Sequence, residues 1–417
     1  MLSVAVNEDL ILAQFDVKTA FLNGCLEEEV YIKQPVGFED GSDRVCRLKK
    51  SLYGLKQAPR CWNQRLTKFL KSKHFVNTEA DPCLYIRNRN ENKLIVVIYV
   101  DDGLVAGSNQ EDINEFLSQM ESEFEIKKGN FEYFLGVSIM KLQDGSLFLS
   151  QKTYARKILE RFNMSEANAV STPALKLEKP ERDEIETKVP FRECVGSLMY
   201  LMLVTRPDIT YAVSYVGQYL EKPSRKNWSD VKRILRYIKG TLDCGLVFKK
   251  VDSPVLEGYA DADFASDENS RLSRSGFIAQ YGKCSVSWFS RKQTSVVLST
   301  TESEYVASSE GARELMWLQK LLSEITEVHC IPKLFVDNNG AVKLSKSSQV
   351  FHKRSKHIDV RHHYVRDMVE NNKILLEHIY GEKQLADVMT KPLPRPRFAK
   401  LIEGFNIVKE EVLKLLR

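Results

Sequence analysis

Two adjacent aspartates, Asp101 and Asp102, lie between two apolar runs and are the first residues whose chemistry stands out. The β-branched run Leu94 to Val100 predicts a strand, and Asp102-Gly103 predicts a positive-φ turn into a second strand that ends near Gly107. A turn needs one aspartate, whereas two neighbouring carboxylates repel unless a cation lies between them. Magnesium is typically held by one or two carboxylates together with substrate phosphates. Taken alone, the motif also suits a solvated turn.

A third aspartate, Asp16, follows the short run Ala13 to Phe15, so its carboxylate is expected to project from a strand end. By itself it would suit a helix N-cap equally well. A phosphoryl transfer in which a 3′-hydroxyl attacks and pyrophosphate leaves needs two divalent cations bridged by carboxylates. One aspartate from an early strand and a pair from a hairpin tip are the minimum protein groups for that reaction.

Four carboxylates nearer the C-terminus follow a second pattern: Asp261, Glu304, Asp337 and Asp387. Two of them end predicted strands, one begins a long helix over 301–322, and the last lies in a helix predicted over 381–390. Each has an ordinary explanation as a turn residue, part of a capping box, a helix cap or a solvent-facing acid. Together, their order is similar to that of the ribonuclease H fold, in which four carboxylates hold two metals and cut the RNA strand of a hybrid.

The elements that position these residues alternate between strand and helix patterns. Up to residue 150, short strands and helices near 62–69 and 111–124 predict an antiparallel sheet covered by helices, closed by a strand pair at 134–140 and 147–149. Residues 164–190 are polar and proline-rich, which predicts a linker. Helices over 192–203, 209–220 and 224–239 follow, the last basic and amphipathic. A new α/β pattern begins near residue 246.

The composition is that of a globular protein, with 417 residues, 43% hydrophobic and 28% charged. Between Arg44 and Lys73 there are ten Lys or Arg residues, no acid and three interleaved aromatics. Such a segment predicts contact with nucleic acid or nucleotide, although a solvated basic face is the alternative. No apolar run approaches the span of a bilayer and no secretory signal is visible. The eight cysteines form no Cys-x-x-Cys pair, which favours a reduced intracellular compartment.

Four histidines, His352, His357, His362 and His363, raise the question of a zinc site. Lysines and arginines surround them and cysteine partners are missing from the spacing, so zinc is disfavoured. We predict a basic patch that faces phosphate.

Three blocks closely resemble the reverse transcriptase of copia-like LTR retrotransposons, in the family's order and spacing. They are Gln14-Phe15-Asp16-Val17-Lys18-Thr19-Ala20-Phe21-Leu22-Asn23-Gly24, Ser51-Leu52-Tyr53-Gly54-Leu55-Lys56-Gln57-Ala58-Pro59-Arg60 and Tyr99-Val100-Asp101-Asp102. Phe134-Leu135-Gly136 matches the strand that follows the hairpin in such enzymes. Four later blocks are similar to the family's ribonuclease H region: residues 258–263, 299–305, 336–338 and 384–392.

The resemblance implies an α+β fold in four parts. A polymerase palm, an antiparallel sheet with helices, would cover residues 1–150, and a helical thumb or connection region 151–245. An α/β ribonuclease H-like domain would cover 246–393, followed by a helical tail over 394–417.

The resemblance also implies roles for particular residues. The polymerase metal ligands would be Asp16, Asp101 and Asp102, and those of the nuclease would be Asp261, Glu304, Asp337 and Asp387, with two Mg²⁺ or Mn²⁺ ions per site. Phe21 would exclude the ribose 2′-hydroxyl, or else be a core aromatic. The incoming nucleotide and template would be lined by Tyr53, Lys56, Gln57 and Arg60. Asp359 also matches the family but lies outside the expected tetrad.

The implied function is an RNA-directed DNA polymerase with ribonuclease H activity, acting on an RNA template, RNA–DNA hybrid and dNTPs. It would work in a cytoplasmic retrotransposon particle or the nucleus, neither secreted nor bound to a membrane. Family members carry a fingers subdomain before the palm, and Asp16 lies only fifteen residues from the start. We therefore expect a polyprotein fragment or a decayed genomic copy. A nucleic-acid-binding remnant without polymerase activity, in which at most the nuclease is active, is the alternative.

Overall fold

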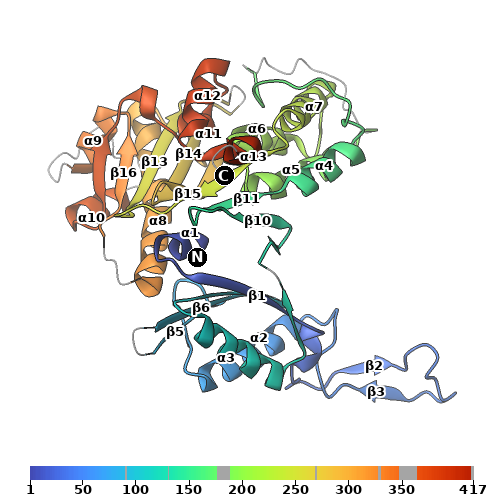
Figure 1. Cartoon of the computed structure of the whole chain (residues 1–417). Helices are drawn as coiled ribbons and strands as arrows, with labels where there is room; N and C mark the ends of the chain where they lie inside the picture. Colours follow the sequence, from blue (N-terminus) through green and yellow to red (C-terminus); the bar gives the residue numbers. More distant parts are fainter. Residues whose placement is uncertain are drawn as a thin grey trace. The chain divides into compact units, whose positions relative to one another are not determined.

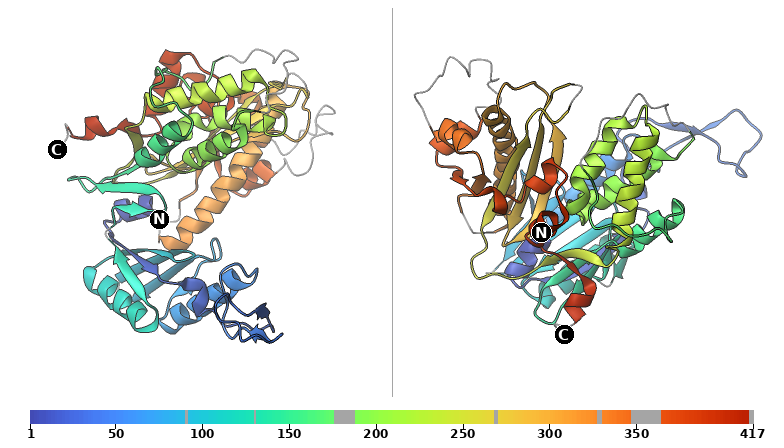
Figure 2. Two further views of the ribbon diagram at one scale, coloured as in Figure 1. Left: turned by 90° about the vertical axis from the view of Figure 1, so that its right-hand side faces the viewer. Right: turned by 90° about the horizontal axis from the view of Figure 1, so that it is seen from above.

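The computed structural model describes residues 1–89, 92–129, 131–175, 188–267, 270–326, 330–346 and 364–414. The chain forms two compact units (Figure 1; Figure 2). The first comprises residues 1, 8–135 and 324–326, and the second comprises residues 2–7, 136–323 and 327–417. All eight cysteines are free. Within the described ranges, no helix has the length and apolarity that crossing a membrane requires.

The first unit is built on an antiparallel sheet with the strand order β4-β5-β6-β7-β1-β8. The strands are β4 (Val76–Asn77), β5 (Leu84–Arg89), β6 (Asn92–Tyr99), β7 (Asp102–Gly107), β1 (Ile11–Val17) and β8 (Ile126–Gly129). Helices α2 (Ala58–Ser72) and α3 (Gln110–Glu123) share an apolar core with the sheet, to which they contribute Trp62 and Phe116. A sheet covered by helices is thus confirmed here, as part of a mixed α+β protein.

Between β1 and α2 the chain forms a 3-10 helix, η1 (Ala20–Asn23), and a separate two-stranded ribbon of β2 (Tyr31–Lys33) and β3 (Val45–Arg47). The last strand of this unit is β9 (Tyr133–Phe134). Four of the ten basic residues between 44 and 73 form ion pairs: Arg44 with Asp40, Arg47 with Glu29, Arg60 with Glu28 and Arg65 with Glu123. Acids outside this basic segment thus neutralise part of its charge.

The second unit begins with strands that we had assigned to the first sheet. Strands β10 (Val137–Lys141), β11 (Leu147–Ser150), β12 (Cys244–Phe248) and β18 (Ile407–Lys409) lie in an antiparallel sheet in the order β18-β12-β11-β10. The predicted pairing of β10 and β11 with each other is confirmed. The expectation that they close the N-terminal sheet is wrong, because β11 pairs on its other side with β12 of a second sheet. The C-terminal segment contains β18 between α12 (Arg395–Glu403) and α13 (Glu410–Lys414), so it is not wholly helical. The predicted domain boundaries themselves stay predictions.

A helical layer in the second unit packs around one apolar core. Its helices are α4 (Lys152–Arg161), α5 (Phe191–Val204), α6 (Thr210–Val216) and α7 (Arg225–Lys239), with 3-10 turns η2 (Pro207–Ile209) and η3 (Gly217–Tyr219) on either side of α6. The helix predicted over 209–220 is thus shorter than expected. The short α1 (Leu2–Asn7) also belongs to this unit, where Ser3 Oγ donates to the Tyr281 carbonyl (3.1 Å).

Of the predicted linker, residues 164–175 contain no helix or strand, and residues 176–187 lie outside the described part of the chain. The four histidines assigned to a basic patch, together with Asp359, also fall outside it, within 347–363.

A mixed sheet of order β15-β14-β13-β16-β17 completes the second unit. Its strands are β13 (Leu256–Asp263), β14 (Arg274–Tyr281), β15 (Cys284–Lys292), β16 (Lys333–Val336) and β17 (Leu375–His378). The first three pair antiparallel, and β16 then pairs parallel with both β13 and β17. Its helices are α8 (Thr300–Ile325), α9 (Asn339–Lys346) and α10 (Tyr364–Glu370). This topology brings the ends of β13 and β16 to the same edge of the sheet.

The single helix predicted over 381–390 is wrong. The structure has a 3-10 turn η5 (Gly381–Lys383) and a one-turn helix α11 (Asp387–Thr390). They are separate because the buried side chain of Gln384 donates to the Ala260 carbonyl (2.9 Å), which ties this segment to β13.

Candidate metal centres

The β6–β7 hairpin carries Asp101 and Asp102 at its tip, as predicted, but its turn is built differently. Tyr99 pairs with Asp102, which leaves Val100 and Asp101 as the two turn residues. The positive φ belongs to Val100 (59°), not to Gly103. A β-branched residue is strained in that conformation. Gly103 is required for another reason: a Cβ atom there would overlap the buried Phe15 ring.

Two long-range hydrogen bonds hold the carbonyl groups of this strained turn. The indole Nε1 of Trp62, on α2, donates to the Val100 carbonyl at 2.6 Å. The amide of Val17, at the end of β1, donates to the Asp101 carbonyl at 2.8 Å. Trp62 is therefore a positioning residue for the hairpin tip. From the sequence, Trp62 is expected only to begin the helix near 62–69 and to be one of the aromatics of the basic segment, since no local pattern reveals a contact with residue 100.

The strand register brings two of the polymerase candidates face to face. Asp16 on β1 and Asp102 on β7 are cross-strand partners, and directly opposite side chains have Cβ atoms about 4.5–5.5 Å apart. The pKa of Asp102 is raised by partial burial and by the charges of Asp101 and Asp16. The three carboxylates are thus close enough to repel one another, which is the electrostatic condition for binding a cation.

The residues predicted to line the nucleotide are only partly gathered. The rings of Phe21 and Tyr53 pack with centroids 4.9 Å apart. Lys56 and Gln57 lie in the turn that leads into α2. Arg60, on the first turn of that helix, pairs with Glu28. Phe21 and Tyr53 therefore share a site, whereas Arg60 is directed to an acid.

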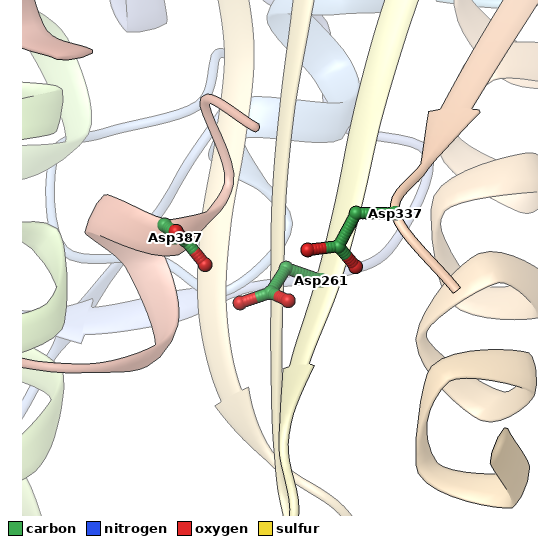
Figure 3. Close-up of side chains that lie close together, drawn as sticks. All are labelled: Asp261, Asp337 and Asp387. Atoms are coloured by element: carbon green, nitrogen blue, oxygen red, sulfur yellow. The ribbon is translucent and has the colours of Figure 1, made fainter. Parts of the chain in front are cut away.

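The second group of carboxylates is tighter. One oxygen from each of Asp261, Asp337 and Asp387 lies within 4.8 Å of the others (Figure 3). Asp261 comes from β13, Asp337 directly follows β16, and Asp387 begins α11. Asp337 does not cap α9, because Asn338 Oδ1 accepts the Ala341 amide there (3.0 Å). Three elements that are distant in sequence therefore direct carboxylates to one point.

The fourth predicted member, Glu304, does not take part in capping helix α8, because other residues make the capping hydrogen bonds. The cap of α8 uses Ser299, whose hydroxyl accepts the Glu302 amide (3.2 Å), and Glu302, whose carboxylate accepts the Leu298 amide (2.7 Å). The capping explanation for Glu304 is therefore wrong. Glu304 is only 6% exposed, and its Oε2 atom has no hydrogen-bond partner within the described part of the chain.

Burial and neighbouring charge perturb the acids of this cluster. Desolvation, with added repulsion from Asp261 and Asp337, raises the pKa of Glu304 to about 10. Burial and the charge of Asp261 raise the pKa of Asp387 to about 6, against the opposing effects of Lys391 and Arg397. Carboxylates whose ionised forms are this unfavourable are typical of sites completed by a cation.

Three polar residues that sequence reasoning did not single out contact the cluster. Thr390 Oγ1 donates to Asp261 Oδ2, and Arg397 donates to Asp387 Oδ2. The ammonium of Lys391 lies 2.6 Å from Asp387 Oδ1 and 3.4 Å from Asp261 Oδ2. Thr390 and Lys391 lie in the block that resembles the family, which was the available signal, but Asp261, which both of them contact, is about 130 residues away on β13.

A glycine allows α11 to approach the sheet. Gly276 on β14 is the cross-strand partner of Asp261. A Cβ atom at this position would lie 2.6 Å from Thr390 Cγ2, 2.7 Å from Met389 Cβ and 2.9 Å from the Ala386 carbonyl. The missing side chain is therefore what lets Asp387 reach Asp261.

The donor set suits a hard divalent cation. All the candidate ligands are carboxylate oxygens, which favour Mg²⁺ or Mn²⁺ over softer metals. The unpartnered Oε2 atom of Glu304 is a buried acceptor that a cation or its bound water would satisfy. The residues of the second cluster therefore fit divalent metal ions. Within the described residues, the three aspartates at the hairpin tip form no group of oxygens as tight as 4.8 Å, so they fit a metal ion less well.

Comparison with known proteins agrees with this architecture. The family described as reverse transcriptase (RNA-dependent DNA polymerase) matches residues 1–176. The chain is 42% identical, over 95% of its length, to the retrovirus-related Pol polyprotein from transposon TNT 1-94 of Nicotiana tabacum, and 38% identical, over 98%, to that from transposon RE2 of Arabidopsis thaliana. It covers 31% and 28% of those relatives, respectively.

A shorter relative is matched throughout. The transposon Ty5-1 protein of Saccharomyces cerevisiae is 30% identical over 72% of this chain and 100% of its own length. Among solved structures, the N-terminal ribonuclease H domain of a Mycobacterium tuberculosis protein overlaps 36% of this chain and 99% of its own, with 13% identity and a TM-score of 0.25. That score is too low for the likeness to carry weight.

The fold and the comparisons define a retroelement protein that joins a reverse transcriptase region to a second, mixed sheet whose edge carries an acidic cluster. The chain belongs to the family of Pol polyproteins from copia-like LTR retrotransposons. It spans about a third of the length of the plant Pol polyproteins that it matches.

Proposed function

We propose that the second unit is a divalent-metal-dependent ribonuclease that cuts the RNA strand of an RNA–DNA hybrid. The observation that carries the proposal is the convergence of Asp261, Asp337 and Asp387 within 4.8 Å, beside the buried Glu304, whose Oε2 atom has no hydrogen-bond partner among the described residues. Bound Mg²⁺ or Mn²⁺ would supply an activated water and neutralise charge on the scissile phosphate. The natural setting of such an activity would be a cytoplasmic retrotransposon particle or the nucleus.

The protein residues have distinct tasks in this proposal. Asp261, on the central strand β13, and Asp337, directly after the neighbouring parallel strand β16, would hold the metal. Asp387 completes the group from α11, oriented by Arg397. Glu304 reaches the cluster from α8 and would ionise when it acquires a cationic neighbour, because its pKa near 10 reflects burial and repulsion.

A direct assay tests the nuclease. Full-length protein is incubated with labelled RNA–DNA hybrid, with and without Mg²⁺. We expect metal-dependent cleavage that Glu304→Gln reduces by at least a hundredfold while the fold is retained. Cleavage that is independent of metal, or undiminished in Glu304→Gln, would refute the proposed site. RNA binding that is steep in salt, without turnover, would instead favour a binding remnant.

The cross-strand register of Asp16 and Asp102 favours a second activity, RNA-directed DNA polymerisation in the first unit. Asp16, Asp101 and Asp102 would hold metal ions together with the phosphates of a dNTP. Phe21 and Tyr53 would shape the nucleotide pocket, and Phe21 would exclude a ribose 2′-hydroxyl. The segment that contains Lys56, Gln57 and Arg60 would contact the template.

Primer extension on an RNA template tests the proposed polymerase activity. Asp101→Asn is expected to abolish extension and leave hybrid cleavage intact, and Glu304→Gln to do the reverse. Loss of both activities in one variant would contradict two separate sites.

A further inference from the structure

Lys391 stands out in the acidic cluster because one ammonium group bridges two elements. Its Nζ atom lies 2.6 Å from Asp387 Oδ1 on α11 and 3.4 Å from Asp261 Oδ2 on β13. Both carboxylates are essentially buried, whereas the lysine side chain is 34% exposed. The ammonium therefore reaches inward from the rim of the site.

The same two carboxylates are members of the group whose oxygens converge within 4.8 Å. A Mg²⁺ ion bound by them would lie about 2.0–2.1 Å from each ligand oxygen. An ammonium 2.6 Å from one of these oxygens would then be a close neighbour of like charge. Arg397 differs, because among the described residues its guanidinium contacts a single carboxylate oxygen, Asp387 Oδ2.

We propose that Lys391 is an internal counter-cation which competes with a divalent metal for the oxygens of Asp261 and Asp387. The inference rests on the proposed metal-dependent nuclease. Its flexible four-carbon stem and partial exposure let the ammonium withdraw toward solvent when a metal ion binds. Lys391 thus lowers metal affinity and stabilises the packing of α11 on β13. A residue that merely supported the fold would do the opposite, since its loss would weaken metal binding.

Calorimetric titration of Mn²⁺ into the full chain, without nucleic acid, tests the competition. Every variant carries Asp101→Asn so that the hairpin tip contributes little binding. Lys391→Met removes the charge and keeps much of the stem, and Lys391→Gln is a second neutral variant in case the first does not fold. Lys391→Arg keeps the charge, and Lys400→Met changes an exposed lysine on α12.

The two neutral variants are expected to bind Mn²⁺ about tenfold more tightly than the parent, as removal of one adjacent charge implies. Lys391→Arg and Lys400→Met should stay within about threefold of the parent. In the presence of a chelator, the neutral variants should melt at a lower temperature than the parent. Addition of Mn²⁺ should raise their melting temperature by more than it raises that of the parent. If a folded neutral variant binds Mn²⁺ no more tightly than the parent, Lys391 does not compete with the metal, and the proposed nuclease site is unaffected by that result. If the parent binds no more Mn²⁺ than Asp261→Asn, the proposed metal site itself fails.

Discussion

Glu304 illustrates how environment sets the chemistry of a single side chain. It starts the second turn of α8, where an acid is usually solvated, but only 6% of it is exposed. Ser299 and Glu302 form the helix cap, so Glu304 is not needed for that purpose. Its carboxylate instead lies near Asp261 and Asp337, whose charges add to the desolvation cost. The residue is therefore costly to the fold, and a bound cation would offset that cost.

This cost predicts a pH dependence of stability. The folded pKa of Glu304, about 10, lies above the ordinary glutamate value of 4.5 that applies in the unfolded chain. Between these values the folded chain holds a proton that the unfolded chain has lost. The contribution of Glu304 to the free energy of unfolding is therefore complete at low pH and is lost as the pH rises toward 10. The loss is at most about 1.4 kcal/mol per pH unit. Melting temperatures are measured in the presence of a chelator at pH 6, 7.5 and 9. The melting temperature of Glu304→Gln relative to that of the parent protein should increase with pH. A constant difference across pH would contradict the raised pKa.

Helix α11 shows how a short element depends on its surroundings. A single helical turn is not stable alone. It is held by Gln384, which donates to the Ala260 carbonyl, by Thr390, which donates to Asp261, and by close contact over Gly276. Asp387 therefore reaches the metal cluster only because β13 and β14 provide the surface on which α11 rests.

A substitution at Gly276 tests this dependence. Gly276→Ala places a methyl group 2.7 Å from Met389 Cβ and 2.9 Å from the Ala386 carbonyl, so α11 must shift. We expect about 1–3 kcal/mol of destabilisation and weaker Mn²⁺ binding as Asp387 moves from Asp261. Gly196→Ala is the matched control, since its Cβ would meet nothing within 4 Å in helix α5. Equal effects of the two substitutions on Mn²⁺ binding would show that the packing of α11 does not position Asp387.

The elements that the sequence predicted best are those with a strong periodic pattern. The β6–β7 hairpin and the helix expected near 111–124, which is α3, agree with the structure, because a β-branched run and a helical spacing of apolar residues report burial directly. The positive φ at Val100 was missed, since Asp102-Gly103 has the stronger local signal. Long-range contacts were also inaccessible: no local pattern shows that β11 pairs with β12 or that Lys391 reaches Asp261.

At the scale of the whole molecule, each unit has its own apolar core and its own carboxylate group. The groups differ in geometry. In the second unit three carboxylate oxygens converge within 4.8 Å, and within the described residues Asp16, Asp101 and Asp102 form no group that tight. A looser group of carboxylates needs additional ligands, which substrate phosphates supply. The two units should therefore differ in whether metal alone is sufficient for binding.

Scanning calorimetry of the full chain tests this difference. We expect two unfolding transitions, because separate cores unfold separately. Mn²⁺ alone should raise the midpoint of the second unit, with stabilisation of about 2.7 kcal/mol at a hundred times the dissociation constant. The first unit should shift only when a dNTP is added with the metal. Asp261→Asn should remove the shift caused by Mn²⁺ alone, and Asp101→Asn should remove the shift caused by Mn²⁺ with dNTP. The two variants also show which transition belongs to which unit. If Mn²⁺ alone shifts both transitions equally, the first unit binds metal without phosphate, and its three aspartates must converge as tightly as those of the second.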